Sequence, residues 1–213
     1  MNIGILGSGM VGQALATKLV SLGHSVMIGT RDSSKLAEFT QTVPGVAVGS
    51  FAATAAHGEI VFNATAGDAS LAALEQAGTE NLRGKILIDM ANPLDFSQGM
   101  PPSLSIANTD SLGEQIQRAF PETRVVKTLN TLAAPLMVDP GQLADGNHHI
   151  FVSGNDAEAK AQVSAFLQAE FGWKEIIDLG DITTARGTEM LLPVWVRLWG
   201  ALGTPMFNFK IVR

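Results

Sequence analysis

The chain has 213 residues and a net charge of −6, and 46% of its residues are hydrophobic while 16% are charged. Such a balance is typical of a globular protein, and the acidic net charge argues against nucleic acid as a partner, because phosphate binding needs a concentrated basic face. The absence of cysteine excludes disulfides, thiolate metal ligands and thiol nucleophiles.

Neither a metal site nor a membrane segment is expected. The four histidines (His24, His57, His148 and His149) lack the i, i+4 spacing of a helical zinc site. No apolar run reaches the ~18 residues of a membrane span, and the first strand leads directly into a glycine turn without a secretory signal pattern. We therefore expect a cytoplasmic protein that contacts no membrane.

Apolar runs and helical periodicities alternate along the chain. In order, they predict strand 2–7, helix 10–23, strand 25–29, helix 33–41, strand 45–50, helix 50–58, strand 59–65, helix 68–78 and strand 84–93. They continue with a surface loop over 94–108, helix 110–120, strand 123–131, a short helix within 132–146, strand 148–154, helix 156–172 and strand 173–180.

The last predicted element is a long apolar helix over 182–203 with Pro193 inside it, followed by a tail. Leu191, Trp195 and Leu198 lie at helical spacing, which indicates a face that packs on the core or on a subunit partner. The alternative is that these aromatic residues form a wall of an acceptor pocket. We favour the first interpretation and expect residues of about 180–213 to be a small C-terminal extension that helps to form a homodimer.

Strands that alternate with helices predict an α/β fold of Rossmann type. The expected sheet is doubly wound and mostly parallel, is covered by helices on both faces, and belongs to a single domain over residues 1–213. Ligands of such sheets bind beyond the carboxyl ends of the strands. The motifs described next lie at those ends.

The segment GSGMVG places Gly7, Gly9 and Gly12 in the G-x-G-x-x-G spacing, after a predicted strand and at the start of a helix. The first glycine permits a tight turn, the second allows a pyrophosphate to approach the backbone, and the third allows close helix–strand contact. A turn that is only structural is the alternative, but the position between strand and helix favours dinucleotide binding.

The second predicted strand ends in Thr30 and Arg31, with Lys35 four residues further on. An NAD site usually has a carboxylate here, which hydrogen-bonds the ribose. A hydroxyl and two cations suit the 2′-phosphate of NADP instead. The alternative is that Arg31 and Lys35 are ordinary surface charges. Asp32 is an acid close to these cations, and its simplest interpretation is a helix N-cap together with Ser33.

Asn63, Asn92 and Asn130 lie at the carboxyl ends of three further predicted strands and offer amide donors and acceptors near the nicotinamide. Each could equally make a loop or cap hydrogen bond. Small neighbours leave room for the nicotinamide ribose: Ala64, Thr65, Ala66 and Ala91.

No clear proton donor accompanies these residues. The chain has no tyrosine, and Lys127 lies in a strand that the pattern predicts to be buried. Lys127 could act as an acid together with Asn130, but a lysine that contacts solvent or a carboxylate is the better interpretation. A flavin-like ring needs mainly face-to-face alignment with the nicotinamide, so we name no catalytic residue and favour such an acceptor.

Four segments resemble a known family: GILGSGMVGQALATKLVSLGH, GTRDSSK, VVKTLNTLAA, and the stretch from HIFVSGND to ITTAR. They are similar to the NADP oxidoreductases that depend on the deazaflavin coenzyme F420, and to the oxidoreductase domain of the STEAP metalloreductases. This resemblance implies binding of NADP(H) and a small-molecule redox partner. Deazaflavin reductases commonly have His-Thr-Ile-Pro where this chain has NTLA, so F420, FMN and FAD all stay open as the partner.

The resemblance also assigns residues to parts of the site. It implies a pyrophosphate turn at Ser8, Gly9, Met10 and Val11, and a 2′-phosphate site at Thr30, Arg31 and Lys35. It implies a nicotinamide border at Ala64, Thr65, Ala91, Asn92 and Pro93, with Ala133 near the carboxamide and the acceptor ring against Asn130, Thr131 and Leu132.

The favoured hypothesis is an NADPH-dependent oxidoreductase that transfers hydride between NADP(H) and a flavin or deazaflavin. Two alternatives remain: a reductase of a small carbonyl or imine that uses Lys127 or Asn130 to handle the proton, and a non-catalytic NADP(H) sensor.

Overall fold

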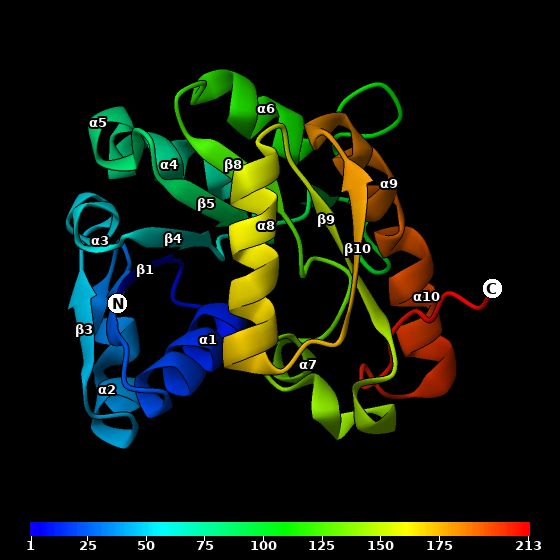
Figure 1. Ribbon diagram of the computed structural model, residues 1–213, viewed down its shortest axis with the longest axis horizontal. Helices are drawn as coiled ribbons and strands as arrows, with labels where there is room; N and C mark the ends of the chain where they lie inside the picture. Colours follow the sequence, from blue (N-terminus) through cyan, green and yellow to red (C-terminus); the bar gives the residue numbers. More distant parts are fainter.

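The computed structural model describes residues 1–213 and contains one large sheet (Figure 1). Its strands are β1 Asn2–Leu6, β2 Ser25–Gly29, β3 Val46–Gly49, β4 Ile60–Asn63, β5 Ile86–Asp89, β8 Arg124–Lys127, β9 His149–Ser153 and β10 Glu175–Gly180. They are arranged in the order β10-β9-β8-β5-β4-β1-β2-β3. Every neighbouring pair is parallel except β8 and β9, which meet antiparallel at Lys127 and Ser153. The predicted Rossmann-type, mostly parallel sheet is thereby confirmed.

The strand order creates a crevice at a defined place. The chain passes from β1 to β2 and β3 on one side, then returns to place β4 on the other side of β1. Ligands of open α/β sheets bind at such a switch point, beyond the carboxyl ends of the strands. The ends of β1, β2 and β4 therefore surround the candidate site.

Helices cover both faces of the sheet because the strands are apolar on both sides. One face packs against α1 Met10–Ser21, α7 Ala134–Val138 and α8 Ala157–Phe166. The other face packs against α3 Phe51–His57, α4 Ser70–Ala77, α5 Thr79–Leu82, α6 Leu112–Ala119 and α9 Ala185–Met190. The remaining helices are α2 Ala37–Thr42, which follows β2, and α10 Leu192–Leu202, which lies at the opposite edge of the molecule from β3 (Figure 1).

Two predicted elements differ from the structure. The single helix over 182–203 is broken at Leu191 into α9 and α10, because Pro193 has no N–H and starts a new helix in its first turn. The segment 94–108, predicted to be an irregular loop, contains a small antiparallel hairpin of β6 Leu94–Asp95 and β7 Ser103–Leu104.

Helix α10 is apolar but only partly covered by the rest of the chain. Large apolar side chains on and beside it are exposed by 39–56%: Met190, Val194, Trp199 and Leu202. Trp195, by contrast, is buried and stacks on Phe207 of the tail. None of the helices is both long enough and apolar enough to cross a bilayer. One side of α10 is therefore an apolar surface without a partner in this chain.

Candidate functional site

The turn between β1 and α1 requires glycine at two positions. Gly7 has a φ of +115°, and its N–H donates to Gly29 O at 3.0 Å. A Cβ on Gly12 would lie 2.0 Å from Gly7 O, so only glycine allows the helix to approach the strand this closely. Gly9 differs, because a Cβ there would meet no atom within 4 Å. The space beside Gly9 is therefore not filled by other atoms of the protein.

That open space lies at the N-terminus of α1. Gly9 is the N-cap residue, no side chain caps the helix, and no acidic residue occupies its first turn. The first N–H groups and the positive end of the helix dipole are consequently available to an anion.

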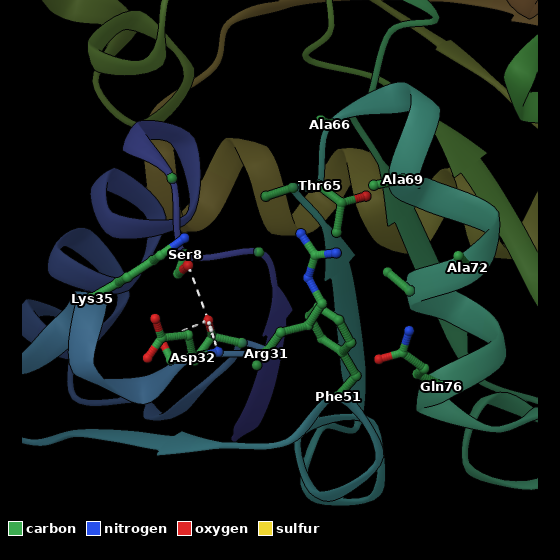
Figure 2. A pocket seen from close by; sticks show the side chains of 16 residues that line it. Ser8, Arg31, Asp32, Lys35, Phe51, Thr65, Ala66, Ala69, Ala72 and Gln76 are labelled. Atoms are coloured by element: carbon green, nitrogen blue, oxygen red, sulfur yellow. Dashed lines mark hydrogen bonds between the residues drawn. The ribbon is translucent and has the colours of Figure 1, made fainter.

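A cavity of about 230 Å³ begins at this turn. Its walls come from the β1–α1 turn, the end of β2 and the loop after it, the end of β4, and helices α3 and α4. Figure 2 shows Ser8 and Lys35 on one side, Thr65 and helix α4 with Ala72 and Gln76 on the other, and Arg31 between them.

Two cations line this cavity at the end of β2. Arg31 and Lys35 are exposed, and neither belongs to any ion pair of the chain. Two unpaired cations on one wall give this part of the cavity a positive charge, which would attract an anion.

Asp32 does not neutralise these cations by pairing with them. Its Oδ1 accepts hydrogen bonds from Ser34 Oγ at 2.6 Å and Ser34 N at 3.0 Å, so it caps the turn Ser33–Leu36. These bonds, the side-chain bond first, together with the nearby Lys35, lower the pKa of Asp32. The predicted role of Asp32 as a helix cap is confirmed.

Thr30 ties the loop after β2 to the glycine turn. Its Oγ1 lies 3.2 Å from Ser8 Oγ and accepts a hydrogen bond from Asp32 N at 3.2 Å. Both hydroxyl groups line the cavity between the helix N-terminus and the cations. The structure thus brings Ser8, Thr30, Arg31 and Lys35 together around one space.

The residues expected near the nicotinamide fall into two groups. Ala64 and Thr65 line the cavity. The other residues expected near the nicotinamide or the acceptor do not line it: Ala91, Asn92, Pro93, Asn130, Thr131, Leu132 and Ala133. Of the residues expected at the glycine turn, Met10, Val11 and Gly12 do not line it either. Asn130, Thr131 and Leu132 are 2–5% exposed, in the loop after β8.

Lys127 is buried, and its ammonium group has a partner for each of its protons. Its Nζ lies 2.8 Å from Asp89 Oδ2 and 2.8 Å from Glu189 Oε1, and it also donates to Ala91 O. An ammonium has three protons, and each has a partner. Burial by itself would lower the pKa of Lys127, but the two carboxylates outweigh it and the pKa is raised. Lys127 is therefore a lysine paired with carboxylates and is not placed to protonate a substrate.

Sequence patterns did not identify the far wall of the cavity. Five residues of α3, α4 and the turn before α4 complete it: Phe51, Ala69, Ala72, Ala73 and Gln76. An alanine-rich helix such as α4 is also typical of a packed core, so its pattern carries no signal for a ligand. Only the fold shows that one of its faces is turned toward Arg31 (Figure 2).

Comparison with known proteins agrees with this geometry. Residues 2–93 match the family model "NADP oxidoreductase coenzyme F420-dependent". A crystal structure from Arthrobacter sp. FB24, of a protein inferred to be an F420-dependent NADP reductase, is 61% identical over 100% of both chains, with a TM-score of 0.97.

Two further relatives were identified by sequence. The F420-dependent NADP reductase of Methanothermobacter marburgensis is 27% identical over 93% of this chain and 92% of its own length. Metalloreductase STEAP3 of Rattus norvegicus is 33% identical over 91% of this chain, which spans only 38% of that protein.

Proposed function

The chain belongs to the family of coenzyme F420-dependent NADP oxidoreductases, and on that premise we propose that it transfers hydride between NADP(H) and a deazaflavin or flavin ring. Full-length identity of 61% with a protein inferred to be an F420-dependent NADP reductase supports F420 as the first acceptor to test. FMN and FAD are the other candidates, because residues 130–133 are NTLA.

The observation that carries the choice of NADP is the pair of unpaired cations, Arg31 and Lys35, on the cavity wall at the end of β2. Asp32 is the only acid that lines the cavity, and its carboxylate is engaged by Ser34. A dianionic phosphate fits this wall better than a ribose hydroxyl does.

The residues around the cavity suit a dinucleotide that enters along α1. The open space at Gly9 and the free N–H groups of α1 would hold the pyrophosphate, and Arg31 with Lys35 would hold the 2′-phosphate. Ala64 and Thr65 would border the ribose on the nicotinamide side. Asn130, Thr131 and Leu132, next along the strand ends, are then the residues nearest to the acceptor.

When bound, NADPH supplies the hydride. The titratable side chains that line the cavity are Arg31, Asp32 and Lys35, all on the adenosine side, and Lys127 is occupied by its own partners. The protein would contribute by aligning the nicotinamide with the acceptor ring and by excluding water. This suits an acceptor ring that delocalises the added electrons.

Rapid mixing of the protein with NADPH and F420, FMN or FAD tests the proposal. We expect loss of the NADPH absorbance with at least one of these rings, and much slower loss with NADH. If no ring oxidises NADPH but a cyclic imine or a ketone does, the carbonyl or imine reductase is correct instead. Tight NADP(H) binding without turnover in either set would identify a sensor.

We also propose that the exposed side of α10 is the contact between two copies of the chain. Val194, Trp199 and Leu202 present an apolar surface that is uncommon on a monomer. Light scattering should give twice the mass of the chain, and Trp199→Glu should give the monomer mass. A parent protein that is monomeric at micromolar concentration would refute this.

A further inference from the structure

Three polar residues lie in one row across the carboxyl edge of the sheet. Asn63 ends β4, Asp89 ends β5 and Lys127 ends β8, and the strand register pairs Asn63 with Asp89 and Asp89 with Lys127. All three are buried, with 0–1% exposure. The row crosses the edge where the nicotinamide half of the ligand is expected.

One end of this row is anchored to the C-terminal part of the chain. Glu189 of α9 is 1% exposed, and it pairs with Lys127 at 2.8 Å. Its two oxygens also accept hydrogen bonds from Leu112 N at 2.8 Å and Gly113 N at 3.1 Å, at the start of α6. Lys127 therefore connects the sheet to two helices that are far apart in the sequence.

The other end of the row reaches the cavity. Asp89 Oδ1 accepts a hydrogen bond from Asn63 Nδ2 at 2.8 Å, and Asn63 Oδ1 accepts one from Thr65 Oγ1 at 2.6 Å. Thr65 lines the cavity. Every link from Lys127 to Thr65 is thus a hydrogen bond between groups with defined positions.

A second branch fixes the loop after β5. Lys127 donates to Ala91 O, and Ala91 N donates to Asp89 Oδ1 at 3.2 Å. The next residue, Asn92, donates from Nδ2 to Asn130 O at 2.8 Å. Lys127 therefore contacts the loop after β5 directly, and Asn92 of that loop bonds to the loop after β8.

We propose that Lys127 is a positioning residue for hydride transfer: together with Glu189 and Asp89 it fixes the loops after β4 and β5 in the places that orient the nicotinamide half of NADP(H). This proposal rests on the proposed function. It assigns Lys127 no contact with substrate and no proton transfer. Small displacements of such supporting groups reduce rates strongly, because hydride transfer depends on the alignment of two rings.

A matched control exists in the same half of the protein. Lys160 of α8 is also buried and ion-paired, with its Nζ 2.8 Å from Asp178 Oδ1 and 2.8 Å from Gly180 O. These partners lie on β10, away from the loops after β4 and β5. Asp178 is 55% exposed, so Lys160→Met removes a lysine–aspartate pair whose carboxylate reaches solvent, and it leaves the row undisturbed.

The test compares the binding of two ligands and the rate of one reaction. Calorimetry measures the Kd of NADP and of 2′,5′-ADP, which carries the adenosine and the 2′-phosphate but no nicotinamide, and rapid mixing measures hydride transfer. For Lys127→Met we expect unchanged 2′,5′-ADP binding, roughly 10-fold weaker NADP binding and a hydride-transfer rate lower by on the order of 10–100-fold. For Lys160→Met we expect both Kd values and the rate to stay at those of the parent.

A second variant protects the test against misfolding. Glu189→Gln leaves Lys127 paired with Asp89 and should shift the ratio of the two Kd values in the same direction by several-fold. The proposal is overturned if, in the variant that folds, the Kd values of NADP and 2′,5′-ADP rise by the same factor or neither Kd changes. If the parent reduces no acceptor, the proposed function fails, while the ratio of the Kd values still decides the role of Lys127.

Discussion

Asn92 and Asn130 bond to each other across the two loops that follow β5 and β8. Asn92 Nδ2 donates to Asn130 O at 2.8 Å, and Asn130 Nδ2 donates to Asn92 Oδ1 at 2.9 Å. Leu129, just before Asn130, is buried and has a φ of +59°, a left-handed conformation that a leucine rarely adopts. The reciprocal bonds therefore hold a strained backbone at the strand ends where we expect the two rings to meet.

Removing one bond of this reciprocal pair should impair catalysis more than folding. Asn130→Ala deletes one bond and leaves Asn92 Oδ1 without its partner, which costs about 1 kcal/mol and lowers Tm by roughly 2–4 °C for a chain of this size. We expect the hydride-transfer rate to fall by at least tenfold as the loop relaxes. Asn81→Ala on α5, which removes bonds to Ala77 O and Ala52 O, is the control and should leave the rate unchanged. Equal rates in both variants would contradict this role.

Much of the fold was predictable because periodicity is a local signal. The alternation of apolar runs and helical spacing gave every strand of the large sheet, and glycine spacing gave the turn before α1. The break between α9 and α10 also has its cause in the sequence, at Pro193, but the apolar pattern on both sides of this proline equally predicts a single helix.

The site was predictable only where its residues are close in sequence. Thr30, Arg31 and Lys35 lie within six positions and meet on one wall of the cavity. The partners of Lys127 could not be found in this way, because Glu189 is brought to it by a separate helix. The wall formed by α4 could not be predicted for a different reason: its alanines have the pattern of a helix packed in a core.

The two glycines at the start of α1 should respond differently to the same substitution. Gly12→Ala places a methyl group 2.0 Å from Gly7 O, so the helix must shift, and thermal melts should show a large loss of stability. Gly9→Ala meets no atom within 4 Å and has an ordinary φ of −76°, so it should fold like the parent. Gly9→Ala should still weaken the binding of NADP by tenfold or more, because the methyl group enters the space left for the pyrophosphate. Unaltered NADP affinity in Gly9→Ala would show that this space holds no ligand.

Acid should weaken the contact between α6 and α9. Arg186 forms two hydrogen bonds with Glu114, of 2.8 Å and 2.5 Å. These bonds, before any other cause, lower the pKa of Glu114. A carboxylate whose folded pKa lies below its unfolded value of about 4.3 stabilises the fold above that pH, and this contribution is lost as the pH falls through the folded pKa.

Urea denaturation at pH 7 and at a series of pH values from about 4.3 downward measures this contribution. We expect the free energy of unfolding of the parent to decrease toward pH 4 and below. Glu114→Gln should cost about 1.5–3 kcal/mol at pH 7 and should flatten the pH dependence. The exposed Glu80→Gln is the control and should change neither quantity. A Glu114→Gln protein with the full acid sensitivity of the parent would assign that sensitivity to other groups.

The most direct test of the account is calorimetric titration of Arg31→Ala with NADP and with NAD, beside the parent and the exposed control Arg83→Ala. Loss of charge-assisted bonds to a 2′-phosphate is worth about 1.5–3 kcal/mol, so NADP should bind roughly 10–100-fold more weakly, while NAD should bind as it does to the parent. If Arg31→Ala binds NADP as tightly as the parent does, the wall formed by Arg31 and Lys35 does not recognise the 2′-phosphate, and the assignment of the cavity to NADP(H) is contradicted.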